Sequence, residues 1–265
     1  MTVPGDRAVV VLLGDRGPVT RAVFHALEEA LRDTAAIEAL LEESPSRWDL
    51  ARRRARRLGW FTVAGHIVFV GAVMPVLRLA GRARVRAIAA DQRLDFGPIG
   101  GAVLVRSVND ERTVEVLRRA SPVLVVVHGT RVIADRVLRE INVPVINLHA
   151  GITPRYRGVH GGYWAFFDGR PDLAGTTVHQ VDAGIDTGAI LGQATFERVD
   201  QDSIATYPYL HVACGLPVLI DTARAVVAGE TPMVRPTLPG AERSQLRWHP
   251  TAWGYLGARL RRGIR

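Results

Sequence analysis

The chain has 265 residues, of which 48% are hydrophobic and 23% charged, and its formal net charge is +8. This length and composition indicate one or at most two folded domains and exclude a chain that is disordered throughout. All 34 basic residues are arginine, and the basic balance favours polyanionic partners without choosing among nucleic acid, anionic lipid and nucleotide-linked substrates. The single cysteine, Cys214, excludes an intrachain disulfide and a cysteine zinc cluster, and we expect it to be a buried thiol.

The first forty residues alternate between strand and helix patterns. Residues 8–13 (AVVVLL) predict a buried strand, the GDRGP turn follows, and residues 19–32 have the apolar spacing of a helix, with Thr20 or Asp15 as its N-cap. Residues 35–41 are expected to form a short second strand. The GDRG turn does not match the G-x-G-x-x-G signature of dinucleotide-binding proteins. The N-terminal sequence lacks the layout of a signal peptide, so we expect a cytoplasmic protein.

Residues 47–86 form an unusual basic and apolar segment. Five arginines in ARRRARRLGW precede an apolar run at 60–77, and further arginines follow it. The run has about the 20 residues of a membrane span, but it contains glycine, proline and His66, and positive charge flanks both of its ends. Three interpretations stay open: a helical insertion packed on the domain or on a dimer mate, an interfacial element attracted to anionic lipid, and a membrane span. We expect His66 to be an ordinary helix residue.

The middle of the chain alternates further strands and helices. Strands are predicted at 103–108, 123–127 and 143–146, with helices at 111–120, capped by Asn109 or Asp110, and at 134–140. Strands that alternate with helices predict right-handed βαβ units and a parallel sheet. Residues 175–181 predict another strand, and 189–197 a strand at an antiparallel edge. The fold class is therefore α/β, with a Rossmann-like, mostly parallel sheet and helices on both faces.

The last sixty residues are predicted to be a helix and a tail. Residues 203–228 have a helical pattern that Pro208 and Pro217 should kink or break, and 232–239 should be extended. The tail at 244–265 is aromatic and basic. We expect a main domain at 1–232, with a basic helical insertion at about 47–86, and a short C-terminal tail at 233–265.

Polar side chains gather near the end of the 143–146 strand. Asn147 and His149 are two residues apart, so in an extended chain they face the same way, at the edge where open α/β sheets bind ligands. An amide and an imidazole could together bind an oxygen that becomes negative when a nucleophile adds to a carbonyl. Asp186, in the loop at 182–188, could keep His149 protonated or accept a proton from an amine. The alternative, that these residues only shape turns, stays open.

Several linked motifs resemble the folate-dependent formyltransferases, which include glycinamide ribonucleotide, methionyl-tRNA and sugar-amine formyltransferases. The motifs are NLHAG, TPRYRG and GTTVHQVDAGIDTGAILGQ. The similarity is best over 121–195 and looser from residue 8 onward. The matching positions are Asn147 and His149, then Pro154, Tyr156, Arg157 and Gly158, and finally Thr177, His179 and Asp186.

The resemblance implies 10-formyltetrahydrofolate as formyl donor, a primary amine as acceptor and no metal. It implies that Asn147 and His149 stabilise the oxyanion and that Asp186 manages the proton. The pterin would be bound largely by the main chain of two loops, whose residues are Gly129, Thr130, Arg131, Val132 and Ile133, and Val181, Asp182, Gly184 and Ile185. The candidates for binding the acceptor are His160, Tyr163 and Trp164, and for each a purely structural role is the alternative. The same two roles stay open for His128.

The acceptor is expected to be a small amine, most often a nucleotide-linked amino sugar. GDRGPVT stands where the purine enzyme has its phosphate-binding loop, which argues against glycinamide ribonucleotide as the acceptor. Gly151, Ile152 and Thr153 stand where the family has serine-leucine-leucine. The residues after the long helix, about 35, are fewer than the roughly 100 of the tRNA enzyme's C-terminal β-barrel.

Two other functions stay open. One is a formyl-folate hydrolase, in which water replaces the amine. The other is a basic protein on a degenerate scaffold, although the intact Asn147, His149 and Asp186 speak against degeneracy. Besides the amine substrate, partners that stay open are an anionic membrane contacted by the arginines from Arg52 to Arg86 and a second copy of the chain; nucleic acid is not expected.

Overall fold

The computed structural model describes residues 7–44 and 47–265, with the side chains of all these residues except 47–50 and 53. Its centre is a seven-stranded sheet in the order β3-β2-β1-β4-β5-β6-β7. The neighbours from β3 to β5 are parallel, whereas β6 and β7 are antiparallel, which confirms both the fold class and the antiparallel edge. The strands are β1 (Ala8–Gly14), β2 (Ala35–Glu42), β3 (Val103–Val105), β4 (Leu124–His128), β5 (Val145–His149), β6 (Gly175–Gln180) and β7 (Ile190–Thr195).

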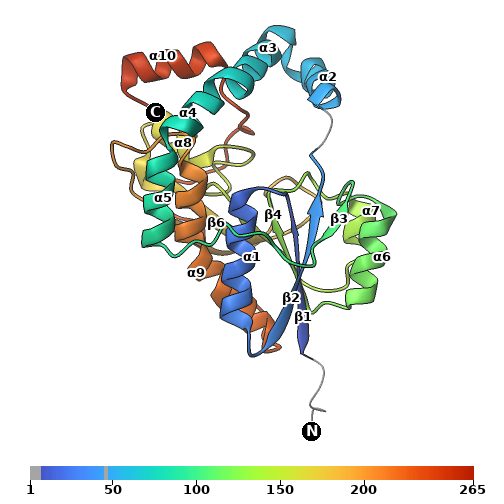
Figure 1. Ribbon diagram of the computed structural model, residues 1–265. Helices are drawn as coiled ribbons and strands as arrows, with labels where there is room; N and C mark the ends of the chain where they lie inside the picture. The colour runs from blue at the N-terminus through green and yellow to red at the C-terminus, as the bar shows by residue number, and fades with distance from the viewer. Residues whose placement is uncertain (1–6, 45–46) are drawn as a thin grey trace.

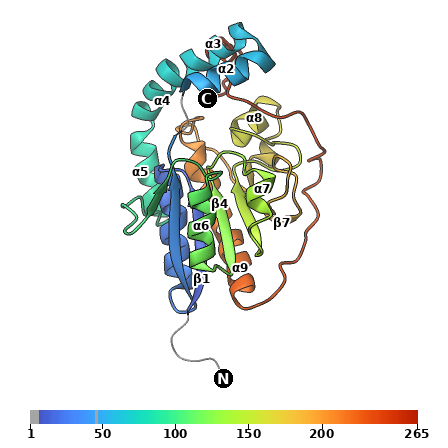
Figure 2. The same cartoon turned by 90° about the vertical axis from the view of Figure 1, so that its right-hand side faces the viewer.

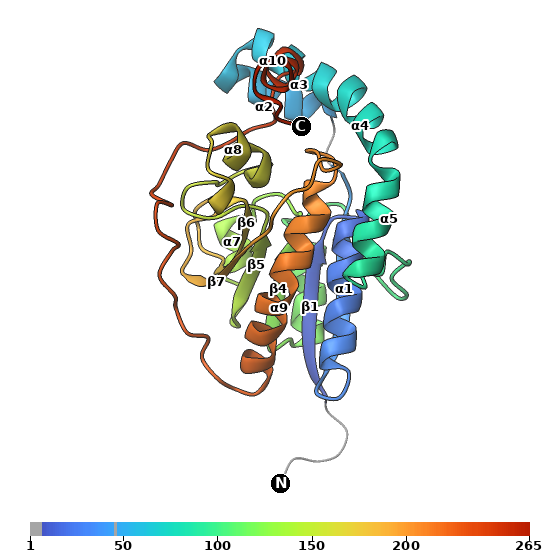
Figure 3. The ribbon, with the colours of Figure 1, turned by 90° about the vertical axis from the view of Figure 1, so that its left-hand side faces the viewer.

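Helices cover both faces of the sheet. On one face lie α1 (Pro18–Leu31) and α9 (Tyr207–Val227), and on the other lie α6 (Glu111–Ala120) and α7 (Asp135–Leu138), as Figures 2 and 3 show from opposite sides. Side chains alternate along β1 accordingly: Val10 and Leu12 join the core under α1 and α9, while Val11 and Leu13 join the core under α6 and α7.

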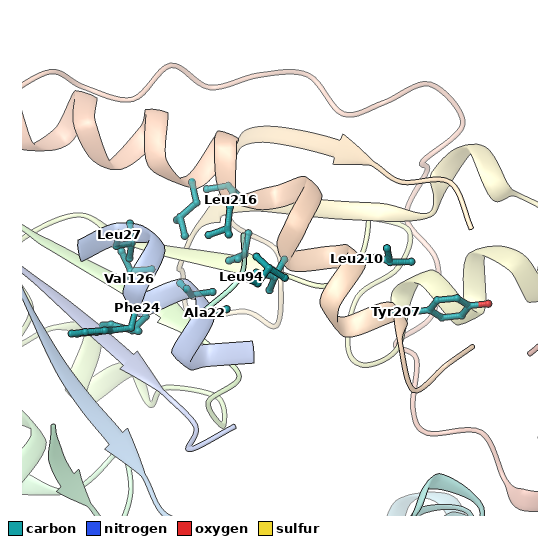
Figure 4. Packing of buried hydrophobic residues seen from close by; sticks show 14 of the residues in the cluster. Ala22, Phe24, Leu27, Leu94, Val126, Tyr207, Leu210 and Leu216 are labelled. Carbon is teal, nitrogen blue, oxygen red and sulfur yellow. The ribbon is translucent and has the colours of Figure 1, made fainter. Parts of the chain in front are cut away.

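The core between α1 and α9 is the larger of the two. Phe24 and Leu27 of α1 are buried together with Leu210 and Leu216 of α9 and with Leu94, which follows the helical insertion (Figure 4). Burying a large apolar side chain contributes about 1.5–3 kcal/mol. This packing holds the helices that flank the central strands.

The helix predicted to be kinked or broken by proline runs unbroken as α9, so the predicted break is wrong. Pro208 lies in the first turn, where a backbone N–H has no partner within the helix anyway. Pro217 lies inside the helix and removes one hydrogen-bond donor. The helix continues because the buried residues Leu216 and Leu219 on either side of it pack in the core.

The basic segment is helical, as predicted, and extends to Asp91. Its parts are α2 (Arg47–Leu58), α3 (Trp60–Val68), the π-helical turn η1 (Phe69–Val73), α4 (Met74–Ala80) and α5 (Arg82–Asp91). The wide turn of η1 precedes Pro75, which has no N–H for the normal bond to the preceding turn. Two helical runs, Trp60–Ala80 and α9, are long and apolar enough to cross a membrane by length and composition alone. The apolar stretch of α9 is 44% buried, because that helix packs on the sheet. The apolar stretch of Trp60–Ala80 is only 28% buried.

The C-terminal part returns along the sheet to its carboxyl edge. After α9 an extended segment passes beside β7, where the N–H of Arg235 donates to the carbonyl of Ile190 (2.8 Å), and it ends above α8 (Gly161–Phe167), as Figure 2 shows. The tail then forms a helix, α10 (Ala252–Arg262), which was not predicted from the sequence. Thr251 caps this helix by accepting a hydrogen bond from the N–H of Gly254 (3.1 Å).

Candidate active site

Asn147 lies on β5, directly opposite His179 of β6. Its Nδ2 is 3.1 Å from Nε2 of His179, while Nδ1 of that ring is 2.7 Å from the carbonyl of Gln180. Since a carbonyl only accepts, Nδ1 of His179 carries the proton and Nε2 accepts from the Asn147 amide. Burial first, and then the nearby His149, lower the pKa of His179, which agrees with a neutral ring. The second N–H of Asn147 remains for a ligand.

His149 is oriented by the loop that follows β5. Its Nε2–H donates to the carbonyl of Tyr156 (2.8 Å). Only glycine fits at position 151, because a Cβ there would come within 2.2 Å of that carbonyl oxygen. The other ring nitrogen, Nδ1, lies 3.4 Å from Oδ1 of Asp186. His149 is therefore fixed with one nitrogen on the backbone and the other beside a carboxylate.

Asp186 reaches back to the strand from the loop after β6. Its backbone has a φ of 51°, in the left-handed region that few residues other than glycine adopt. Its Oδ2 accepts a hydrogen bond from the N–H of Gly158 (2.9 Å), and its side chain is 14% exposed. Backbone strain in a functional loop persists where surrounding contacts hold it. The structure thus brings together Asn147, His149 and Asp186.

The loop between β5 and α8 is tied to β6. Thr177 Oγ1 donates to the carbonyl of Gly151 (2.8 Å) and accepts from the N–H of Thr153 (3.0 Å). The peptide bond before Pro154 is cis. Arg157 extends from this loop to the carbonyls of Ile185 and Ser244. These bonds hold the carbonyl of Tyr156 and the N–H of Gly158 where His149 and Asp186 need them.

A pocket of about 630 Å³ opens over these groups. Its walls include Asn147, His149, Asp186 and His160. They also include every residue predicted for the two pterin loops, namely Gly129, Thr130, Arg131, Val132, Ile133, Val181, Asp182, Gly184 and Ile185. Hollows of about 830 and 800 Å³ lie elsewhere on the described surface, but none of the predicted site residues lines either of them.

Neutral histidines line the pocket. Nε2 of His160 is 2.8 Å from Nδ1 of His249, and His211 accepts a hydrogen bond from the N–H of Gly162 (3.2 Å). Burial lowers the pKa of His160 to about 4 and the pKa values of His249 and His211 to about 3. At neutral pH these rings can therefore serve as uncharged hydrogen-bonding groups.

Tyr163 and Trp164 do not line this pocket. Tyr163 is 1% exposed, and its ring contacts Trp164, Phe167 and Tyr255. Trp164 donates from its indole N–H to the carbonyl of Trp248 (3.0 Å). The two rings pack α8 against the C-terminal segment, so of the three acceptor-side candidates only His160 reaches the pocket.

Several pocket residues were missed in the sequence or only partly recognised. Asp15 accepts from Thr20 (2.5 Å), whose hydroxyl lies 2.8 Å from Nδ1 of His128, so a polar chain crosses the end of β1. The position of Asp15 directly after a predicted strand was the available signal. Arg54 and His249 also line the pocket. No local pattern marks these two, because they come from the insertion and the tail.

No group of three or more histidine, cysteine, aspartate or glutamate side chains in the described part of the chain could hold a metal ion. The polar groups around the pocket instead offer N–H donors, neutral imidazoles and one carboxylate beside an imidazole. Such a set can bind a developing oxyanion and accept a proton from a nucleophile.

Comparison with known proteins gives one consistent result. Residues 9–209 match the family model described as formyl transferase. The methionyl-tRNA formyltransferase of Pelotomaculum thermopropionicum is 29% identical over 153 residues, which cover 55% of this chain and 49% of that protein. The phosphoribosylglycinamide formyltransferase of Bacillus subtilis is 34% identical over 98 residues, which cover 37% of this chain and 50% of that protein. The chain thus spans about half the length of these relatives.

A solved structure with the same fold is that of a sugar N-formyltransferase from Shewanella sp. It is 16% identical, the match covers 89% of this chain and 75% of that one, and the TM-score is 0.54.

Proposed function

The chain belongs to the formyl transferase family, and from this premise we propose that it transfers a formyl group from 10-formyltetrahydrofolate to the primary amine of a small molecule. Members of the family use 10-formyltetrahydrofolate as formyl donor. The observation that carries the proposal is that Asn147, His149 and Asp186 converge on one pocket, and that both loops expected to bind the pterin line the same pocket.

The proposed reaction needs only groups that line this pocket. The amine forms a bond to the formyl carbon, and the carbonyl oxygen becomes an oxyanion that accepts hydrogen bonds from the free N–H of Asn147 and from the Nδ1–H of a protonated His149. The Nε2–H of His149 is already donated to the Tyr156 carbonyl. Asp186 accepts the proton that the amine loses, directly or through a water. The oxyanion then re-forms the carbonyl of the new formamide as the bond between the formyl carbon and the folate nitrogen breaks. The folate nitrogen takes up the proton held by Asp186, directly or through a water, and tetrahydrofolate leaves.

The acceptor in this proposal is a nucleotide-linked amino sugar. The Asp15 carboxylate at the end of β1 would repel a phosphate there, whereas Arg54 on α2 offers a cation for the phosphates of a nucleotide. The neutral rings of His160 and His249 can exchange hydrogen bonds with sugar hydroxyls. The Shewanella relative, a sugar N-formyltransferase, adds support from the fold alone. We place the enzyme in the cytoplasm.

The test is to incubate the protein with 10-formyltetrahydrofolate and a panel of nucleotide-linked amino sugars. Mass spectrometry should show an acceptor that gains one formyl group while tetrahydrofolate appears in equal amount. Glycinamide ribonucleotide and uncharged amino sugars belong in the same panel, because formylation of either in preference to the nucleotide-linked sugars would overturn the choice of acceptor. Formate release without any formylated amine would instead identify a hydrolase.

A further inference from the structure

Positive charge is concentrated in two parts of the chain. Residues 50–90 and 243–265 contain 15 of the 34 arginines and none of the 26 acidic residues. The rest of the chain holds 19 arginines against those 26 acids, a net charge of −7. The two basic parts lie together in space, since α3 and α10 are neighbours above the carboxyl edge of the sheet (Figure 1). The charge of this protein is therefore a property of one region.

The same region exposes an apolar surface. Along the helical run Trp60–Ala80 the inward positions, such as Val63, Phe69 and Met74, are buried. The outward positions are apolar as well, and the exposed side chains among them include Trp60, Phe61, Ile67, Val68, Val70, Val76 and Leu79. No charged residue occurs from position 60 to position 77. A surface helix of a globular protein normally has charged or polar residues on its outer face, whereas this helical run is apolar on both its inner and its outer face.

α10 continues this surface. The Phe61 and Trp253 rings lie 4.5 Å apart, and position 65 must be glycine because a Cβ there would come within 2.6 Å of the Trp253 ring. Trp253, Leu256 and Leu260 remain exposed at 44%, 48% and 84%. We call the exposed apolar side chains of Trp60–Ala80 and α10 the apolar platform. Exposed arginines border the apolar platform. Arg56 and Arg57 lie at the end of α2, Arg78 on α4, Arg82 at the start of α5, and Arg261 and Arg262 on α10.

We propose that the apolar platform and its arginines dock this protein peripherally on an anionic lipid bilayer. Apolar and tryptophan side chains would enter the interfacial layer, while the arginines would pair with lipid phosphates. Charge complementarity favours this occupant over a second copy of the chain, because a two-fold contact through the platform would bring two regions of 15 arginines and no acids against each other. The buried face of the run, packed on α10, makes it a helix that lies on the membrane rather than one that spans it.

Docking in this way would place the pocket close to the lipid headgroups. Arg54 of α2 and His249, which precedes α10, belong to the two basic parts and also line the pocket. If the protein is the formyltransferase proposed above, it would take up the amine acceptor at the membrane surface. Docking itself does not depend on formyl transfer, so the two can fail separately.

The experiment is co-sedimentation of the full chain with vesicles of phosphatidylcholine alone and of phosphatidylcholine with phosphatidylglycerol. Binding is expected to the anionic vesicles only and should weaken as salt is raised. Replacing Val76, Leu79 and Leu260 by serine should lower the partition coefficient at least tenfold. Each of Arg56→Gln, Arg82→Gln and Arg261→Gln should lower it roughly fivefold.

Matched control variants distinguish docking through the apolar platform from non-specific binding to vesicles. Met233→Ser with Val234→Ser removes apolar side chains that are 65% and 60% exposed outside the platform, and Arg112→Gln with Arg119→Gln removes exposed charge on α6. Both should bind vesicles like the native chain. The proposal is overturned if the native chain ignores anionic vesicles, if the control variants lose as much binding as the platform variants, or if release from the vesicles requires detergent. A dimer in sedimentation velocity that the serine variant abolishes, without vesicle binding, would likewise overturn it and assign the platform to a second copy.

Discussion

At the scale of single residues, the geometry of the site depends on the hydrogen-bond partner of each histidine ring nitrogen. His149 gives Nε2 to the carbonyl of Tyr156 and keeps Nδ1 beside Asp186, while His179 gives Nδ1 to a carbonyl and accepts the Asn147 amide. The two rings lie 6.1 Å apart and have different partners. A charge on His149 is thus balanced by Asp186, whereas His179 orients the amide.

Asn147→Ala should lower kcat roughly 10²–10³-fold, because it removes one donor to the oxyanion. The KM for 10-formyltetrahydrofolate should change little, since the predicted pterin contacts lie in other loops. Steady-state kinetics measure both values. Asn142→Ala, exposed before the other end of β5, is the control. A kcat within a fewfold of the native value would remove Asn147 from the oxyanion site.

Asp186→Asn should abolish transfer while preserving the loop, because an amide oxygen can still accept the N–H of Gly158. The residual rate should no longer fall toward acid pH, since the group that must be deprotonated is gone. A pH–rate profile tests this, with Asp200→Asn at the exposed surface as control. An acidic limb of native shape in the variant would show that another base accepts the proton.

His211 makes stability depend on pH. Burial lowers its pKa to about 3, from an ordinary value of 6.5, so between these values the unfolded chain binds a proton that the folded chain does not. The free energy of unfolding should therefore fall as the pH drops below about 6.5. Between pH 7 and pH 5 the free energy of unfolding of His211→Gln should fall by about 1–2 kcal/mol less than that of the native chain. Urea unfolding at the two pH values measures both. Equal losses in the two proteins would mean that His211 is protonated in the fold.

At the scale of elements, α9 fixes β5 and β6 through a close approach at Gly215. A Cβ at this position would lie 2.6 Å from Cγ2 of Thr176 and 2.7 Å from Cδ1 of Leu148. Gly215→Ala should reduce the free energy of unfolding by about 1–3 kcal/mol and lower activity, because Leu148 stands between the two site residues of β5. Gly257→Ala in α10, where a Cβ meets nothing within 4 Å, should instead stabilise by about 0.5–1 kcal/mol. Urea unfolding compares the two, and equal effects would contradict the packing argument.

Elements whose own pattern determines them were predictable from sequence. The apolar runs of β1, β4 and β5 and the βα alternation predicted the parallel sheet. The continuity of α9 through Pro217 was not predictable, since it depends on packing against the sheet. The helix α10 was not predicted, because residues 244–265 were described only as an aromatic and basic tail, although Thr251 and Gly263 are suitable caps for a helix.

At the scale of the whole molecule, the site combines parts that are local in sequence with parts that are distant. Asn147, His149, Asp186 and both loops predicted to bind the pterin lie within sixty residues of one another, and linked motifs could single them out. Arg54 and His249 are separated by almost two hundred residues and meet only through the packing of the insertion on the C-terminal segment. The placement of Tyr163 and Trp164 depended on the same packing.

The central claim is that one pocket holds a formyl donor against an amide, an imidazole and a carboxylate. The most direct measurement uses 10-formyltetrahydrofolate labelled with carbon-13 in the formyl group, mixed with the protein and the panel of amines, and followed by NMR. The account predicts that the label moves into a new formamide with the native chain and remains on the folate with Asp186→Asn. A label that stays on the folate with every amine, or that leaves as formate, would contradict it.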